Sequence, residues 1–262
     1  MSTFSDIQQI LDITENEIGI AWTGQAGFVF KDSDGKIYHT DPYLSNICSQ
    51  TVGYHRVVPA PVSAAKITAD YVFVTHVHKD HLDDDSLPVM AKANPGMKFV
   101  APPSCISRML ELGINYGQLI PIQRGEEKKI GNSMVKAVLA LHTDDSVGFV
   151  IKFGNLSFYI TGDTTYSNEL INIKKEQPNV MMPCINGRLG CMNISDAVRL
   201  TGHIQPNFVI PMHYGMFKEN TANPEEFIRQ AEASSGITKG MILKMGHWYS
   251  FSDKKGFTLH DI

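Results

Sequence analysis

Three histidines and one aspartate stand close together after an apolar run in the first third of the chain. Residues 72–74 are β-branched or aromatic, which predicts a strand that is buried on both faces. His76 and His78 are two positions apart, so they point to the same side of an extended segment, where one metal ion could bind both imidazoles. Asp80 and His81 follow the predicted end of the strand, where a turn could direct them to a second ion. A lone histidine would be an ordinary loop residue, but this group at this spacing favours a metal site.

Three more residues with metal-binding side chains each come directly after an apolar segment. His142 follows residues 138–141, Asp163 follows residues 158–162, and His213 follows residues 208–212. Open α/β sheets hold their functional sites at the carboxyl ends of their strands, so these positions can converge. Taken singly, a histidine after a strand is usually structural, and an aspartate after glycine is usually a turn residue. Asp41 follows a predicted strand over residues 37–40 in the same way, and a turn aspartate is its simplest interpretation.

The predicted elements form two halves, in each of which strands are followed by alternating helices and strands. Strands are expected over residues 17–22, 27–31, 37–40, 72–74, 98–101, 118–122, 127–130, 134–141, 147–153, 157–161, 180–183, 208–211, 241–243 and 248–251, the last being the final strand. Helices are expected over residues 84–93, 103–112, 167–175, 195–204 and 224–233. Residues 46–61 are expected to form a long irregular stretch. The alternation by itself predicts an α/β fold and no more.

The composition is that of a globular protein. The chain has 262 residues, 43% of them hydrophobic, and no linker divides it, so we expect a single domain over residues 1–262. A net charge of −4 gives no general attraction to nucleic acid or to an anionic membrane, so neither is expected as a partner. The 4 cysteines form no Cys-x-x-Cys pair, and the N-terminus lacks the regions of a signal peptide, which favours reduced thiols in the cytoplasm.

The run from His76 to His81 resembles the His-x-His-x-Asp-His signature of the metallo-β-lactamase superfamily. The resemblance implies a four-layer αβ/βα sandwich, in which two mixed β-sheets pack together and helices cover the outer faces. It also implies that Asp41 supports the metal-binding loop from behind. The ligands that it implies are His76, His78 and His142 for one divalent ion, Asp80, His81 and His213 for a second, and Asp163 between the two.

Segments that flank these residues resemble the UlaG-like branch of the superfamily, which includes L-ascorbate-6-phosphate lactonase. These segments are residues 22–28, 41–45, 162–168, 210–214 and 223–227. The resemblance implies a dinuclear hydrolase that uses a metal-bound hydroxide on an ester bond, in a lactone or a phosphorylated sugar-type molecule, with Asp80 orienting the hydroxide. Imidazoles and carboxylates without a thiolate suit Zn²⁺ or Mn²⁺, and also Fe²⁺.

Other classes of function stay open. A phosphodiesterase of the same superfamily, either phospholipase D-type or specific for a cyclic nucleotide, could use the same two ions on a phosphoryl centre. A nuclease would need a basic track, whereas the paired lysines of this chain are scattered. A binding or regulatory protein that has lost catalysis usually lacks a ligand, and all the ligand positions are filled here. We therefore expect an active enzyme with a small-molecule substrate, and the sequence leaves a homo-oligomer open.

A Gly-rich loop over residues 184–193 carries Arg188 and leads into a predicted helix. Arg188 and the amides of the helix N-terminus could hold the anionic group of a phosphorylated substrate, although a flexible surface loop is an equally good interpretation. Asn186 in the same loop, Tyr214 beside the last ligand and His55 in the irregular stretch are further candidates for substrate contact. The remaining histidines are expected to be structural, namely His39, His203, His247 and His260.

Overall fold

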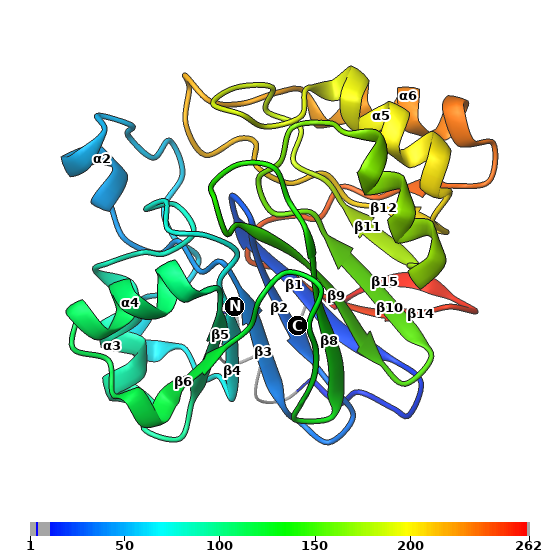
Figure 1. Cartoon of the computed structure of the whole chain (residues 1–262). Helices are drawn as coiled ribbons and strands as arrows, with labels where there is room; N and C mark the ends of the chain where they lie inside the picture. The colour runs from blue at the N-terminus through cyan, green and yellow to red at the C-terminus, as the bar shows by residue number, and fades with distance from the viewer. Residues whose placement is uncertain (1–3, 5–10, 261–262) are drawn as a thin grey trace.

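Two β-sheets packed face to face form the centre of the computed structural model, which describes residue 4 and residues 11–260 (Figure 1). The eight-stranded sheet has the order β15-β14-β1-β2-β3-β4-β5-β6. Its strands are β1 (Ile18–Gly24), β2 (Gly27–Lys31), β3 (Ile37–Thr40), β4 (Tyr71–Phe73), β5 (Lys98–Ala101), β6 (Leu119–Pro121), β14 (Trp248–Ser252) and β15 (Gly256–His260). Strands β3 to β6 run parallel and the others antiparallel, so this sheet is mixed.

The second sheet is also mixed and comes from the later part of the chain. Its order is β13-β12-β11-β10-β9-β8-β7, with the pairs from β10 to β13 parallel and the pairs from β7 to β10 antiparallel. The strands are β7 (Glu127–Ile130), β8 (Ser133–Leu139), β9 (Val147–Phe153), β10 (Leu156–Ile160), β11 (Val180–Met182), β12 (Phe208–Val209) and β13 (Lys239–Gly240). The parallel strands of both sheets end on the side where the chemistry-bearing residues follow them.

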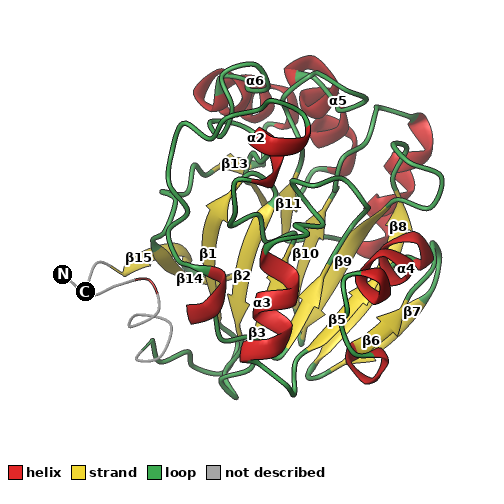
Figure 2. Cartoon of the chain, turned by 90° about the vertical axis from the view of Figure 1, so that its left-hand side faces the viewer, coloured by secondary structure: helices red, strands yellow, loops and turns green. Residues whose placement is uncertain are grey.

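Helices cover the outer faces of both sheets. The described helices are α2 (Ile47–Thr51), which lies apart from the sheets, α3 (Ser86–Ala93), α4 (Pro103–Glu111), α5 (Ile194–Ile204) and α6 (Pro224–Ser235), with the 3₁₀ helices η1 (Ala64–Lys66), η2 (Tyr116–Gln118) and η3 (Asn168–Glu176). Figure 2 shows α3 and α4 lying over the strands of the first sheet, and Figure 1 shows α5 and α6 beside β11 and β12 of the second. Two sheets with helices outside are the layered sandwich expected from the sequence, and this expectation is confirmed.

Alternating residues of the strands explain the layers. In β2, Phe28 and Phe30 belong to the apolar core between the sheets, whereas Val29 belongs to the core under the helices of the first sheet. Neighbouring strand residues point to opposite faces, so a strand that is apolar throughout can serve both cores. All three side chains are fully buried, and burying each stabilises the fold by roughly 1.5–3 kcal/mol.

Several predicted elements differ from those in the structure. The segment 248–251 is not the final strand, because β15 follows it and pairs with it. The expected strand over residues 241–243 is absent, and the short strand β13 precedes it. The helix expected over residues 167–175 is the 3₁₀ helix η3, whose buried residues Leu170 and Ile173 are three apart, the spacing of one 3₁₀ turn. The stretch 46–61 contains the short helix α2.

Two further findings concern the chain as a whole. Among the described residues, no helix has both the length and the apolar character that crossing a membrane requires. The four cysteines are buried and free.

Candidate metal centre

Loops that follow strands of both sheets bring the ligand-type residues together. His76 to His81 follow β4 of the first sheet, while His142, Asp163 and His213 follow β8, β10 and β12 of the second. Gly162 lets the loop after β10 approach Thr75 in the loop after β4. Its φ is +60°, and a Cβ there would lie 2.9 Å from the carbonyl oxygen of Val147 and 3.2 Å from the side chain of Thr75. The centre therefore lies where the two sheets meet.

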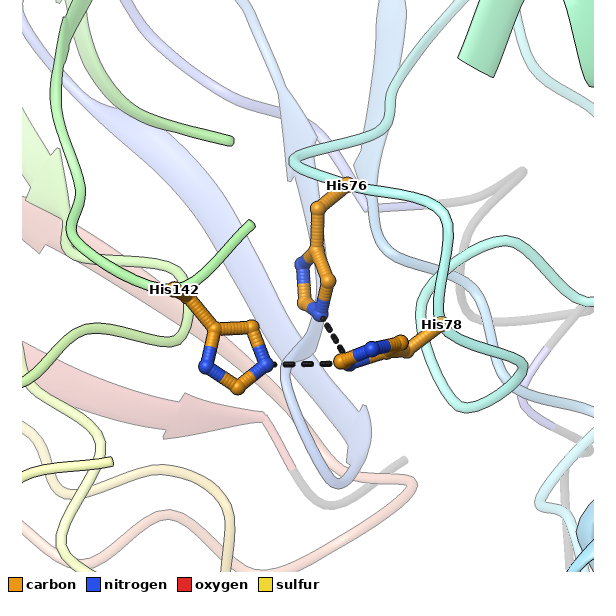
Figure 3. A group of neighbouring side chains, drawn as sticks. All are labelled: His76, His78 and His142. Atoms are coloured by element: carbon orange, nitrogen blue, oxygen red, sulfur yellow. Dashed lines mark hydrogen bonds between the residues drawn. The ribbon is translucent and has the colours of Figure 1, made fainter. Parts of the chain in front are cut away.

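The first group consists of three imidazoles that point toward one another (Figure 3). The Nδ1 atom of His78 lies 3.1 Å from Nε2 of His76 and 2.9 Å from Nε2 of His142. Metal–nitrogen bonds of about 2.0–2.1 Å place two nitrogen ligands on one Zn²⁺ roughly 3.3 Å apart, so this convergence fits a shared cation. His76 is buried, whereas His78 is exposed, so the group opens toward solvent on one side.

The second group combines one carboxylate with two imidazoles. The Oδ2 atom of Asp80 lies 3.2 Å from Nε2 of His213 and 3.7 Å from Nε2 of His81. The two Nε2 atoms are 3.3 Å apart. His81 and His213 are buried, and Asp80 is partly exposed. This group therefore also offers three donor atoms to one position.

The carboxylate of Asp163 lies between the two groups. Its Oδ1 is 3.4 Å from Nε2 of His81 and 3.3 Å from Nε2 of His213. Its Oδ2 is 3.6 Å from Nε2 of His142 and 4.0 Å from Nε2 of His76. Oδ1 is buried without a hydrogen-bond partner, which is costly for a carboxylate oxygen unless a cation binds it. The donor set thus fits divalent cations.

The carboxylates of the centre favour positive charge beside them. Burial alone would lower the pKa of His213, but the carboxylates of Asp163 and Asp80 outweigh it and raise that pKa to about 10. Burial would raise the pKa of Asp163, but His213 and His81 hold it well below its ordinary value. The carboxylates thus favour positive charge at this position, which divalent cations would supply.

Asp41 supports the loop from behind. Its Oδ1 accepts a hydrogen bond from the backbone N–H of Thr75 at 2.8 Å, and its Oδ2 accepts one from the Thr75 hydroxyl at 2.8 Å. The same Oδ2 lies 2.8 Å from Nδ1 of His81, which must donate because a carboxylate only accepts. The proton of His81 is therefore fixed on Nδ1, and its Nε2 lone pair faces the centre.

Strained backbone is concentrated around the centre. Seven non-glycine residues among those described have a positive φ, and four of them are Gln25, Asp41, Leu189 and His213. Such conformations cost roughly 1–3 kcal/mol each and persist where the surrounding structure enforces them, often at functional sites. The local sequence does not favour these conformations, so the tertiary structure imposes them.

Two residues of the centre were not predicted. Gln25 lies in the β1–β2 turn, and its Nε2 donates to Oδ2 of Asp80 at 2.8 Å and lies 3.1 Å from Nε2 of His213. Cys191 forms a further group of potential ligands with His142 and Asp163, whose donor atoms lie within 4.8 Å of one another. The structure thus adds one sulfur atom to the potential donors near the centre, and the donor set predicted without sulfur stays a prediction. The only sequence signal for Cys191 was its place in the Gly-rich loop.

A cavity of about 520 Å³ opens above the centre. Besides residues of the centre, it is lined by Cys48, Val52, Tyr54, Val77, Lys79, Leu189, Phe217 and Asn220. Most of these side chains are apolar. Lys79 is a cationic side chain of the lining, and its Nζ is paired with Asp84 at 2.6 Å. The pocket therefore offers apolar walls around a polar floor.

The residues predicted to contact substrate lie outside this lining. Arg188 and His55 are exposed, whereas Asn186 and Tyr214 are buried. Asn186 donates to Asn220 at 2.7 Å, and the ring of Tyr214 stacks on Trp22 at a centroid distance of 4.9 Å. Their contact with substrate stays a prediction, although Arg188 immediately precedes Leu189 of the lining.

The helix N-terminus after the Gly-rich loop is capped by a carboxylate side chain of the helix itself. Helix α5 begins at Ile194, and a capping box joins Asn193 and Asp196. Asn193 accepts from the backbone N–H of Asp196, and the Asp196 carboxylate accepts from the backbone N–H of Asn193. The Asp196 carboxylate therefore lies at the helix N-terminus whose amides could hold a substrate phosphate, and that binding role stays a prediction.

Comparisons with known proteins agree with this geometry. The chain is 29% identical to a "UPF0173 metal-dependent hydrolase" of Archaeoglobus fulgidus, over 89% of this chain and 99% of that one. It is 31% identical to a protein of the same description from Aeropyrum pernix, over 90% and 98% of the two chains. The structure of Igni18, described as a metallo hydrolase from Ignicoccus hospitalis, superposes with a TM-score of 0.74 at 24% identity and covers 90% and 99% of the chains, which shows a common fold.

A family model described as "Beta-lactamase superfamily domain" matches residues 19–213. This match spans every residue of the two His/Asp groups, together with Asp41 and the β1–β2 turn. The chain therefore belongs to the metallo-β-lactamase superfamily and, within it, to the UPF0173 family of metal-dependent hydrolases.

Proposed function

We propose that this metal-dependent hydrolase is dinuclear and cleaves the ester bond of a lactone or similar small ester, as the lactonases of the UlaG-like branch do. The observation that carries the proposal is the position of Asp163, whose two carboxylate oxygens face separate groups of nitrogen donors. A carboxylate in that position can bridge two cations. When bound, two divalent ions supply an acidic water molecule and a Lewis acid that polarises the ester carbonyl.

The side chains of the centre have separable roles in this reaction. His76, His78 and His142 would hold one ion, and His81, His213 and Asp80 would hold the other. Burial would raise the pKa of Asp80, but His81 and His213 lower it, so Asp80 is ionised. Its carboxylate can accept a hydrogen bond from a water molecule at the cavity floor and orient that molecule toward the substrate. Gln25 donates to the same carboxylate and fixes its direction.

The cavity favours a substrate with an apolar substituent. Leu189 and Val52 are exposed on the lining, and Phe217 lies behind them. The ammonium group of Lys79 is already paired with Asp84. Apart from the metal ions, the lining therefore attracts a substrate phosphate only weakly. The geometry therefore supports an uncharged ester better than a phosphorylated sugar. An apolar entrance also suits a lipid phosphodiester, so a phosphodiesterase is the second candidate.

Removal and return of metal tests the function directly. We expect protein stripped of metal to lose hydrolysis of an alkyl-substituted lactone and to regain it when Zn²⁺, Mn²⁺ or Fe²⁺ is returned, with two ions bound per chain. The measurement is turnover beside metal content, on the lactone, a lactone sugar phosphate and bis(p-nitrophenyl) phosphate. Full activity of the stripped protein would contradict the proposal. Faster cleavage of the diester would favour the phosphodiesterase.

The apolar wall is tested at Leu189. This side chain is 66% exposed, lines the cavity and sits at a positive φ. We expect Leu189→Ser to raise KM for a long-chain lactone about tenfold, because the loss of a buried aliphatic contact costs roughly 1–3 kcal/mol, and to change KM for an unsubstituted lactone little. Ile237→Ser is the matched control, since Ile237 is 64% exposed and lies outside the lining. Equal changes for the two lactones would remove the apolar-substituent argument.

A further inference from the structure

Cys191 is held in place by the loop between β11 and α5. Its backbone N–H donates to the carbonyl oxygen of Arg188 at 3.0 Å, and the next residue donates to Thr164 at 2.8 Å. Gly190 presses the loop onto the centre, because a Cβ at Gly190 would lie 3.0 Å from Nδ1 of His142. This close approach places Cys191 beside a histidine of the first group.

The Cys191 side chain faces the ligand-type residues. It is buried, lines the cavity and offers its Sγ within 4.8 Å of the donor atoms of His142 and Asp163. The thiol also lies against the Asp163 carboxylate and against the thiol of Cys184. The Asp163 carboxylate is nine-tenths buried, with Oδ2 3.6 Å from Nε2 of His142 and with Oδ1 lacking a hydrogen-bond partner. A sulfur, an imidazole and a carboxylate that needs a cation thus converge beside the first group.

Cys184 keeps this arrangement in place. It is fully buried, and its Sγ contacts the carbonyl oxygen of Thr164 at 3.6 Å as well as the Cys191 thiol. A second thiol in contact with the first restricts the rotation of the Cys191 side chain. Cys48 lines the same cavity but belongs to none of the groups of potential ligands found among the described residues.

We infer that Cys191 is a thiolate ligand of the ion that His142 and Asp163 hold. The inference extends the proposed function, on which it rests, by adding sulfur to the donor set. Thiolate ligands favour Zn²⁺, Co²⁺ and Fe²⁺, whereas Mn²⁺ prefers oxygen donors. The centre therefore selects thiophilic ions, and Mn²⁺ is the weaker occupant.

Cobalt provides a direct readout, because a thiolate bound to Co²⁺ gives a sulfur-to-metal charge-transfer absorption in the near ultraviolet. We expect this absorption in the wild-type protein loaded with Co²⁺ and in Cys48→Ser, and its loss in Cys191→Ser. The visible bands of bound Co²⁺ should remain in all three. Zn²⁺ affinity should fall in Cys191→Ser, while Mn²⁺ affinity changes little.

Each outcome separates this inference from the proposed function. Bound Co²⁺ without the charge-transfer band in the wild type, or a band that survives Cys191→Ser, would overturn the ligand role and leave the hydrolase proposal standing. A wild-type protein that binds no Co²⁺ at all would overturn both. If Cys191→Ser does not fold, alkylation of the wild-type protein is the alternative test. Bound Zn²⁺ should slow the modification of Cys191, which mass spectrometry measures. An unchanged rate of modification would contradict the ligand role.

Discussion

Asp163→Asn is expected to lower hydrolysis by roughly 10²–10⁴-fold. The change keeps the shape of the side chain and removes its negative charge, so one atom facing the donor groups becomes an N–H donor. Metal ions contribute several kcal/mol of transition-state stabilisation, and each 1.36 kcal/mol is tenfold in rate. When the ions are bound weakly, much of this transition-state stabilisation is lost. We therefore expect metal content below two ions per chain together with the loss of rate.

Asp145→Asn is the matched control for this variant. Asp145 is partly buried, and its two oxygens accept hydrogen bonds from the backbone N–H of Ser104 at 2.8 Å and from the Ser104 hydroxyl at 2.7 Å. It belongs to none of the potential ligand groups of the described residues. We expect it to keep its metal and its rate. An Asp163→Asn protein with two ions and normal turnover would show that the bridging role is wrong.

Asp41→Asn should weaken metal binding by about 10–100-fold without touching a ligand. With the asparagine NH₂ group in the place of Oδ2, two hydrogen-bond donors would face each other, the amide N–H and the Nδ1–H of His81. The imidazole avoids this clash by moving its proton from Nδ1 to Nε2, the atom that faces Asp80 and His213. A protonated Nε2 cannot bind a cation. Titration with Zn²⁺ against a chromophoric chelator measures the effect.

Asp32→Asn controls for the loss of a buried carboxylate. Asp32 precedes β3 whereas Asp41 follows it, so the two lie at opposite ends of the strand. Its carboxylate is buried and accepts hydrogen bonds from Tyr38 at 3.0 Å and from the backbone of Lys36 at 2.8 Å. We expect the Asp32→Asn substitution to lower the free energy of unfolding by about 1–3 kcal/mol and to leave the Zn²⁺ affinity unchanged. Equal losses of affinity in both variants would mean that Asp41 acts only through stability.

The sequence indicated the ligand-type residues of the centre through their places after strands together with the resemblance to the metallo-β-lactamase superfamily. His142, Asp163 and His213 each follow a buried strand, and strand ends converge in an α/β sheet. Apolar runs mark those strands reliably. The structure brings all of these residues together with the His76–His81 run, as expected. Their role as metal ligands stays a prediction.

Other features of the site depend on contacts that no local pattern encodes. Gln25 reaches Asp80 across 55 positions of the chain and His213 across 188. An amide side chain has no strong preference for a metal site, so only the fold of the β1–β2 turn gives it a role. The same holds for Arg188 and Leu189. The loop backbone, with Leu189 at a φ of +52°, decides which of the two side chains lines the cavity.

The order of strands in the first sheet has a consequence for how the protein is made. Strand β1 pairs with β2 on one edge and with β14 on the other, and β15 then pairs with β14. During synthesis the second edge of β1 stays open until nearly the whole chain has left the ribosome. Such an unpaired edge can pair with other chains. The nascent protein therefore exposes this edge until late in translation, and truncation before β14 would leave it open permanently.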